Sequence, residues 1–187
     1  MNLPNKLTLF RVFTIPFFVI FMEFEILGDF DKFIAVALFI IASITDALDG
    51  HIARKYNLIT NFGKFMDPLA DKLLVSAALI CLSSTIPEWI IVVIISRELI
   101  ISGFRIIAAD NGIVIAASYW GKIKTVFQMI MIIWLILDLN TFVETYIIDL
   151  PIYDIIGKVL IGISLVLTVI SMVDYLIKNK QVLKEDK

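Results

Sequence analysis

Four aspartates in the first half of the sequence have the spacing of a metal site. Asp46 and Asp49 are three residues apart, and Asp67 and Asp71 are four apart. In helices, each of these spacings places both side chains on one face. Four carboxylates at one site repel one another unless cations neutralise them, and oxygen ligands without a nearby cysteine suit hard cations such as Mg²⁺ or Mn²⁺. Two such ions about 3.5–4 Å apart can stabilise both oxygens of a displacement at phosphorus.

Small and basic residues between the two aspartate pairs indicate a phosphate-containing ligand. Gly50 and Ala53 are about one helical turn apart and leave room for a ligand near the backbone. Gly63 gives the backbone conformational freedom in the turn ahead of Asp67. Arg54 adds a permanent cation whose planar guanidinium suits a phosphate. We therefore expect the aspartates and these residues to form one site.

The composition requires that the helices carrying these residues lie in a membrane. Of 187 residues, 60% are hydrophobic and 18% are charged, against roughly 45–50% and about 25% in soluble domains. A small domain cannot bury this excess in one core, so it must face lipid. About 20 mostly apolar residues span the hydrocarbon. Six segments qualify: Leu7–Leu27, Phe33–Tyr56, Phe65–Ile86, Glu88–Ala109, Ile123–Leu139 and Asp154–Ile177.

We therefore predict an all-α integral membrane protein, a six-transmembrane-helix bundle forming a single domain over residues 1–187. Lysine and arginine are concentrated in both terminal regions and in the second and fourth connections with their flanks, whereas the other connections are mainly acidic. Lys32 and Lys158 are exceptions. Excess Lys and Arg mark the cytoplasmic side, so both termini and the aspartates are expected there. The net charge of −2 and the scattered basic residues give no indication of a nucleic-acid partner, and we expect none.

The run Asp46-x2-Asp49-Gly50-x2-Ala53-Arg54-x8-Gly63-x3-Asp67-x3-Asp71 resembles the complete signature of the CDP-alcohol phosphotransferases. The resemblance implies six transmembrane helices, a homodimer and a cytoplasm-facing cavity with two divalent metal ions, Mg²⁺ or Mn²⁺. It also implies that all four aspartates are metal ligands and that Asp71 is the general base. The nucleotide-binding residues that it implies are Asn5, Thr8, Gly50, Ala53, Arg54 and Gly63.

Basic residues outside the aspartate run are expected to choose the acceptor alcohol. Cationic side chains at the cavity suit an acceptor that carries its own phosphate. Arg97 follows Glu88 by only nine residues, so it lies deep in its segment and needs an anionic partner, either Glu98 or a substrate. The predicted acceptor-phosphate ligands are Arg11, Arg97, Arg105, Lys122 and Lys124.

These basic segments, with Leu3–Arg11, resemble a bacterial branch of the family. That branch transfers the phosphatidyl group of CDP-diacylglycerol to sn-glycerol 3-phosphate and releases CMP. The resemblance covers nearly the whole chain and implies an enzyme of the bacterial inner membrane with its active site facing the cytoplasm.

Two other readings stay open on the sequence. Sister enzymes of the same family use serine, inositol phosphate, choline or phosphatidylglycerol as the acceptor. A cation or proton transporter is the alternative from another class, because intramembrane carboxylates also mark ion pathways. Transporters often contain two similar halves with interrupted helices at the midplane, whereas the halves of this sequence are not alike.

Overall fold

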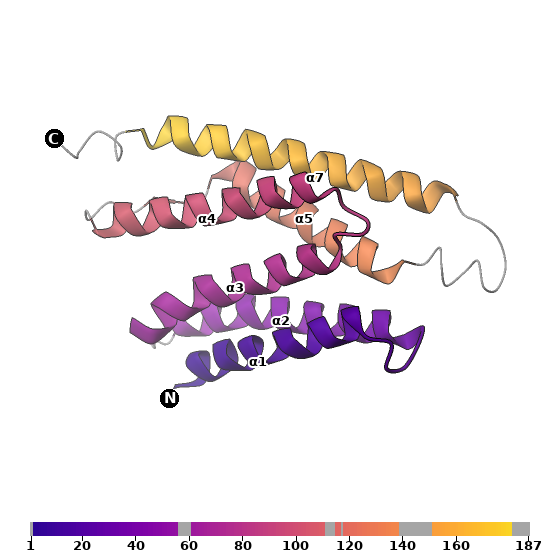
Figure 1. The fold of residues 1–187 in the computed structure, drawn as a ribbon. Coiled ribbons are helices and arrows are strands. Elements are labelled where there is room, and N and C mark those ends of the chain that lie inside the picture. The colour runs from indigo at the N-terminus through magenta and orange to yellow at the C-terminus, as the bar shows by residue number, and fades with distance from the viewer. Residues whose placement is uncertain (1, 56–60, 111–114, 117, 139–150, 181–187) are drawn as a thin grey trace. The chain divides into compact units, whose positions relative to one another are not determined.

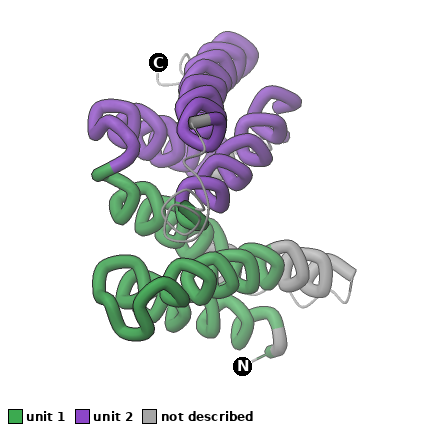
Figure 2. Tube along the Cα trace, turned by 90° about the vertical axis from the view of Figure 1, so that its right-hand side faces the viewer, with its two compact units in different colours: residues 1–84, 136–138 green, residues 85–135, 139–187 purple. Residues whose placement is uncertain are grey.

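The computed structural model describes residues 2–55, 61–110, 115–116, 118–138 and 151–180, and all regular structure within these ranges is helical (Figure 1). This confirms the predicted all-α class. The chain divides into two compact units (Figure 2). Unit 1 comprises residues 1–84 and 136–138, and unit 2 comprises residues 85–135 and 139–187. The helices are α1 (Leu3–Glu23), α2 (Phe30–Lys55), α3 (Asn61–Cys81), α4 (Glu88–Asp110), α5 (Tyr119–Leu137) and α7 (Pro151–Lys178).

Apolar helices of membrane-spanning length are present in both units. Within the described residues, three stretches are long and apolar enough to cross a membrane: Pro4–Glu23, Tyr119–Leu137 and Ile152–Lys178. They correspond to the first, fifth and sixth predicted segments. Helices α2, α3 and α4 have 26, 21 and 23 residues, but they include charged residues. The length and apolar composition of the three stretches therefore indicate a membrane protein. The full count of six spans stays a prediction.

Several helices begin earlier than the predicted hydrophobic segments. Helix α1 starts at Leu3 rather than Leu7 because the Asn2 side chain accepts a hydrogen bond from the Asn5 backbone N–H at 3.2 Å. Pro4 is also compatible with a first helical turn. Hydropathy identifies the part of a helix that lipid can cover, whereas the helical backbone continues into polar residues. Asn5 therefore lies on a helix that also carries the apolar span.

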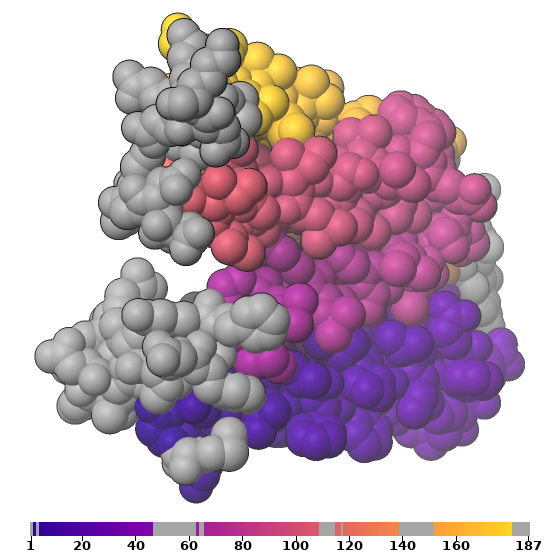
Figure 3. Space-filling model, turned by 60° about the vertical axis from the view of Figure 1, so that its left-hand side comes forward, coloured from indigo at the N-terminus to yellow at the C-terminus, as the bar shows by residue number. Residues whose placement is uncertain are grey.

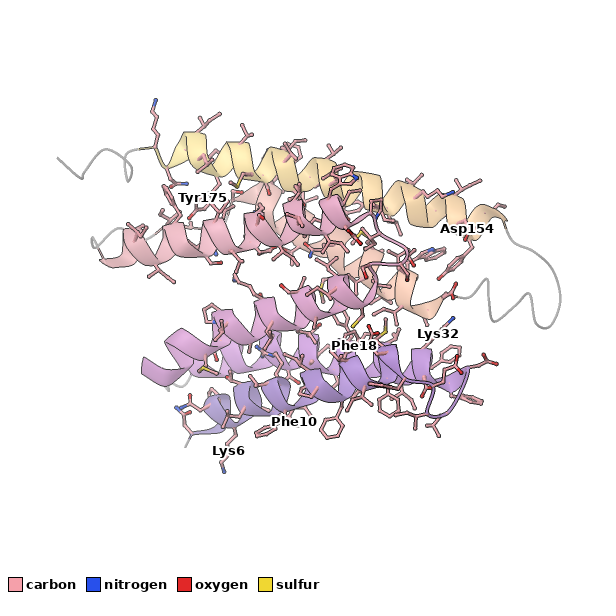
Figure 4. The ribbon with its side chains drawn as sticks, viewed as in Figure 1. Lys6, Phe10, Phe18, Lys32, Asp154 and Tyr175 are labelled. Carbon is pink, nitrogen blue, oxygen red and sulfur yellow. The ribbon has the colours of Figure 1, made fainter. Side chains whose placement is uncertain are left out.

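Unit 1 is built on α1, which packs against both α2 and α3. Phe18 of α1 and Phe39 of α2 are fully buried, with ring centroids 5.9 Å apart. The opposite face of α1 is apolar and exposed at Phe10, Phe13 and Phe17, and Figure 4 shows Phe10 directed away from the neighbouring helices. Helix α1 thus forms part of the surface of unit 1 (Figure 3). Its inner face is available to hold residues of α2 and α3.

A short turn fixes the hairpin formed by α1 and α2. Gly28 has a positive φ of 65°, which a glycine adopts without strain. The buried carboxylate of Asp31 accepts hydrogen bonds from the backbone N–H groups of Ile26 and Leu27, at 2.8 and 3.0 Å from Oδ2. The turn therefore satisfies its own backbone donors and returns the chain alongside α1.

Unit 2 contains α4, α5 and α7. A buried cluster joins α4 to α7 through Ile101, Phe104, Ala108 and Tyr175, and the Phe104 and Tyr175 rings meet edge to face with centroids 5.7 Å apart. Trp134 of α5 stacks on Tyr153 of α7 with a centroid separation of 4.4 Å. Aromatic contacts thus tie α7 to both neighbours.

Candidate active site

The inner face of α1 carries a row of buried polar side chains. Asn5, Thr8, Arg11 and Thr14 follow one another at intervals of three residues, and all four are buried. Residues three apart are neighbours on a helix surface, so each side chain of the row lies next to the following one. A buried polar group is costly unless it is hydrogen-bonded, so the partners of these side chains define what the row does.

Arg11 connects α1 to α2. Its guanidinium is completely buried, with 0% of the side chain exposed. Nη1 donates to Oδ1 of Asp46 at 2.6 Å, and Nε donates to the carbonyl oxygen of Ala42 at 3.2 Å. Charge-assisted hydrogen bonds of this kind are short and roughly twice as strong as neutral ones. The first aspartate of the predicted metal set is therefore held by a cation from α1.

Thr8 makes the corresponding connection to α3. Its fully buried hydroxyl lies 2.5 Å from Oδ1 of Asp67 and 3.1 Å from the carbonyl oxygen of Pro4. A threonine hydroxyl has one proton to donate, and the short contact with a carboxylate is the stronger use of it. The third aspartate of the set is thus also hydrogen-bonded to α1.

The remaining members of the motif are only partly described. Asp71 is exposed and lies one helical turn after Asp67 on α3, and Gly63 is buried near the start of the same helix. The side chains of four further predicted site residues lie outside the described residues: Asp49, Gly50, Ala53 and Arg54.

The described carboxylates fit a divalent metal in donor chemistry. Asp46, Asp67 and Asp71 offer oxygen atoms, the ligands that Mg²⁺ and Mn²⁺ prefer. An ionised carboxylate has about four lone-pair positions, so a single hydrogen bond to α1 is compatible with metal binding through other lone pairs. Within the side chains that the structure describes, no three Asp, Glu, His or Cys groups converge as a complete metal site would. The predicted set includes Asp49, whose side chain is not among them.

A second charged cluster lies in unit 2. The Nζ of Lys124 on α5, a residue with no exposed surface, pairs with Oε1 of Glu98 on α4. Nη1 of Arg97 lies 3.6 Å from the same Glu98 oxygen. Glu98 is thus a partner of Arg97, one of the two that the sequence predicts. Two buried cations share one carboxylate, so these three side chains carry a net positive charge.

Arg97 retains an unused donor inside unit 2. Its Nε is buried and makes no hydrogen bond within the part of the chain that the structure describes. Gly121 of α5 lies against this guanidinium: a Cβ at that position would be 3.4 Å from Nη2 of Arg97 and 3.3 Å from Oγ of Ser118. In the sequence, nothing marks Gly121 as a site residue except that it is a small residue beside Lys122.

The two other predicted acceptor ligands of unit 2 are exposed. Arg105 lies over the ring of Tyr175, with Cζ 5.7 Å from the ring centroid, in a cation–π arrangement. Lys122 is exposed on α5, whereas Lys124 is buried. Arg97 and Lys124 are therefore buried beside one carboxylate, whereas the Lys122 side chain is exposed. Tyr175, far along the sequence, had no signal that linked it to Arg105.

Comparisons with known proteins agree on one family. The family model for CDP-alcohol phosphatidyltransferases matches residues 1–170. A protein of Bacillus subtilis (strain 168) is 46% identical over 98% of this chain and 97% of its own length. Proteins of Haemophilus influenzae and Escherichia coli (strain K12) are 41% and 38% identical, over 94% of this chain and 91% and 93% of their own lengths. All three are named CDP-diacylglycerol–glycerol-3-phosphate 3-phosphatidyltransferase. With the motif Asp46–Asp71 in place, the chain belongs to the CDP-alcohol phosphatidyltransferase family.

Proposed function

We propose that this chain is a CDP-diacylglycerol–glycerol-3-phosphate 3-phosphatidyltransferase, which converts CDP-diacylglycerol and sn-glycerol 3-phosphate into phosphatidylglycerol phosphate and CMP. The observation that carries the proposal is similarity over nearly the full chain, at 38 to 46% identity, to bacterial proteins with this name. The similarity extends beyond the shared metal motif into the segments expected to select the acceptor.

The proposed reaction is one displacement at phosphorus. The hydroxyl of sn-glycerol 3-phosphate attacks the β-phosphorus of CDP-diacylglycerol, a new P–O bond forms, and the P–O bond to CMP breaks. We assign Asp71 as the base that takes the hydroxyl proton, and its exposure on α3 is compatible with this role. A general base typically contributes 10²–10⁴-fold to a rate. The proton ends on Asp71 and the negative charge on CMP.

Asp46, Asp49, Asp67 and Asp71 would hold two divalent ions, Mg²⁺ or Mn²⁺, in this proposal. The hydrogen bonds from α1 to Asp46 and Asp67 support it, because they fix the directions of two of these carboxylates. Ions bound there would neutralise charge on the pyrophosphate and on departing CMP. The proposed nucleotide contacts are Asn5, Gly50, Ala53, Arg54 and Gly63. Thr8 stays a prediction for this role, and its contact with Asp67 leads to a different proposal.

We assign the acceptor phosphate to the basic residues predicted from the sequence. Support is strongest for Arg97 and Lys124, because both cations are buried and both contact the same Glu98 carboxylate, so two positive charges lie close together. The buried Nε of Arg97 is a donor for the acceptor phosphate. Arg105 and Lys122 add exposed cations. Arg11 remains a prediction for this role, and its contacts in unit 1 lead to a different proposal below.

The proposed setting is the inner membrane of a bacterium. In this setting the chain would form a single domain with six spans and cytoplasmic termini. Its active site would face the cytoplasm, and two copies would form a homodimer. Three apolar helices among the described residues support a membrane location. The two acyl chains of the donor would stay in lipid while its pyrophosphate reaches the aspartates.

The test is an acceptor panel with purified full-length protein in detergent. CDP-diacylglycerol and Mn²⁺ or Mg²⁺ are supplied with sn-glycerol 3-phosphate, serine, inositol phosphate or phosphatidylglycerol, and CMP release is measured. We expect rapid release only with sn-glycerol 3-phosphate and with a divalent ion present. Faster release with another acceptor would assign the chain to a sister activity, and no release with any of them would contradict the proposal.

A further inference from the structure

We propose that Arg11 and Thr8 are positioning residues, which orient the aspartates of two different helices for metal binding. The inference rests on the proposed function, because it concerns the same carboxylates. It differs from the roles predicted from the sequence, which were acceptor binding for Arg11 and nucleotide binding for Thr8. The contacts of both side chains within unit 1 carry the argument.

A single helix reaches both aspartate-bearing helices. Thr8 and Arg11 are three residues apart on α1, on its buried face. Thr8 contacts Asp67 of α3, and Arg11 contacts Asp46 of α2. Helix α1 packs against both of these helices. The positions of the Asp46 and Asp67 carboxylates relative to each other therefore depend on a single helix, α1.

The guanidinium of Arg11 is held at two points on α2. Ala42 and Asp46 are one helical turn apart, and Arg11 donates to the carbonyl of the first and the carboxylate of the second. A planar guanidinium presents its donors in a fixed fork, whereas a lysine ammonium is a point charge on a flexible stem. The Ala42 contact thus fixes the direction from which the Asp46 carboxylate is approached.

Thr14 lies on the same helix as Thr8, and its hydroxyl contacts no aspartate among the described residues. Thr14 is also buried, and its hydroxyl donates to the Phe10 carbonyl at 2.8 Å, as Thr8 approaches the Pro4 carbonyl. Among the described residues, only Thr8 of this pair contacts an aspartate. A Thr-to-Val change at either site keeps the shape and removes one hydroxyl. The two positions therefore form a matched pair.

Partners that hydrogen-bond to metal ligands commonly change metal affinity by 10–100-fold when they are removed. The metal affinity can be measured without turnover. Mn²⁺ is titrated into the full chain in detergent without substrates, and electron paramagnetic resonance measures the free ion. We expect Thr8→Val to weaken Mn²⁺ binding about 10-fold or more, Thr8→Ser to restore it, and Thr14→Val to leave it at the wild-type value.

Arg11 is tested by Arg11→Lys, which keeps the charge and loses the fork. We expect weaker Mn²⁺ binding and a lower kcat, with the KM for sn-glycerol 3-phosphate unchanged. A raised KM with unchanged Mn²⁺ affinity would identify Arg11 as an acceptor ligand and overturn its positioning role. Lys32→Met is the control, because Lys32 pairs with Asp138 in the same unit and, among the described side chains, contacts none of the metal-site aspartates.

The outcomes separate this inference from the proposed function. A wild-type chain that releases CMP and binds Mn²⁺, with a folded Thr8→Val variant that binds Mn²⁺ equally tightly, overturns the positioning role alone. A wild-type chain that releases no CMP with any acceptor overturns the proposed function. The Mn²⁺ titration of the matched threonine variants still decides the positioning role in that case.

Discussion

The ammonium of Lys124 and the carboxylate of Glu98 form an ion pair between α5 and α4, and no part of the lysine is exposed. Arg97 lies 3.6 Å from the same carboxylate oxygen. Glu98 is therefore the shared counter-charge for two buried cations. Removing one partner of a buried pair is more damaging than losing a surface pair, because the remaining charge stays desolvated.

Glu98→Gln should therefore destabilise unit 2. The amide keeps a hydrogen-bond acceptor and loses the charge, so we expect a loss of about 1–3 kcal/mol in the free energy of unfolding. Titration of the detergent-solubilised protein with SDS, followed by circular dichroism, measures it. Lys32→Met is the comparison, since it breaks a pair with Asp138 in which the side chains are 37% and 40% exposed, and it should cost less than about 1 kcal/mol. Equal losses in the two variants would show that Glu98 has no special role.

Asp71→Asn should reduce kcat by about 10²–10⁴-fold if Asp71 accepts the proton of the acceptor hydroxyl. The amide is nearly isosteric but cannot serve as a base. CMP release in a single turnover at saturating Mn²⁺ measures the chemical step. Near-normal turnover with metal bound would refute the base assignment. The neighbouring variant Lys72→Gln, at an exposed contact with the Pro68 carbonyl, should retain wild-type turnover.

The helical setting of the motif aspartates could be predicted from the sequence because it depends on local spacing. Asp46, Asp67 and Asp71 lie on helices, as the intervals of three and four residues require. The sequence also indicates Glu98 as one of two candidate partners for Arg97, the other being an anionic substrate, and the structure places the Glu98 carboxylate near Arg97.

Contacts between distant segments had no comparable signal. The pairing of Arg11 with Asp46 joins residues 35 positions apart, and Thr8 and Asp67 are 59 apart. Spacing within one helix does not specify which residue of another helix it meets. Hydropathy likewise located the helices but not their polar ends, and this is why α1 and α3 begin four residues before the predicted segments.

Arg105→Ala should raise the KM for sn-glycerol 3-phosphate if this cation binds the acceptor phosphate. Loss of a charge-assisted hydrogen bond is worth about 1.5–3 kcal/mol, or more than roughly tenfold in KM. Tyr175→Phe keeps the ring beneath Arg105 and should preserve the KM, whereas Tyr175→Leu removes the cation–π contact and should raise it. Initial rates of CMP release at varied acceptor concentration measure these effects. Unchanged KM and kcat in Arg105→Ala would place acceptor binding elsewhere.

The predicted topology can be tested with single cysteines. Cys81 is the only cysteine of the chain, so Cys81→Ser gives a cysteine-free background. In that background, Ser84→Cys should react with a membrane-impermeant maleimide in intact cells with a permeabilised outer membrane, because the third connection is predicted to face outward. Asn179→Cys, at the end of α7, should react only after the inner membrane is opened. The reverse pattern would invert the proposed orientation.

Two glycines of α7 differ in the space around them, and this allows the packing of unit 2 to be tested. A Cβ at Gly157 would lie 3.2 Å from Cδ2 of Leu135 on α5, whereas a Cβ at Gly162 would meet nothing within 4 Å. Both changes to alanine bring the same gain in helix propensity, but only the first forces a neighbour to move. Overpacking typically costs about 1–3 kcal/mol. We therefore expect Gly157→Ala to be less stable than Gly162→Ala by an amount in this range, measured by SDS titration of the two variants side by side. If they are equally stable, α7 does not pack against Leu135 as closely as the distance implies.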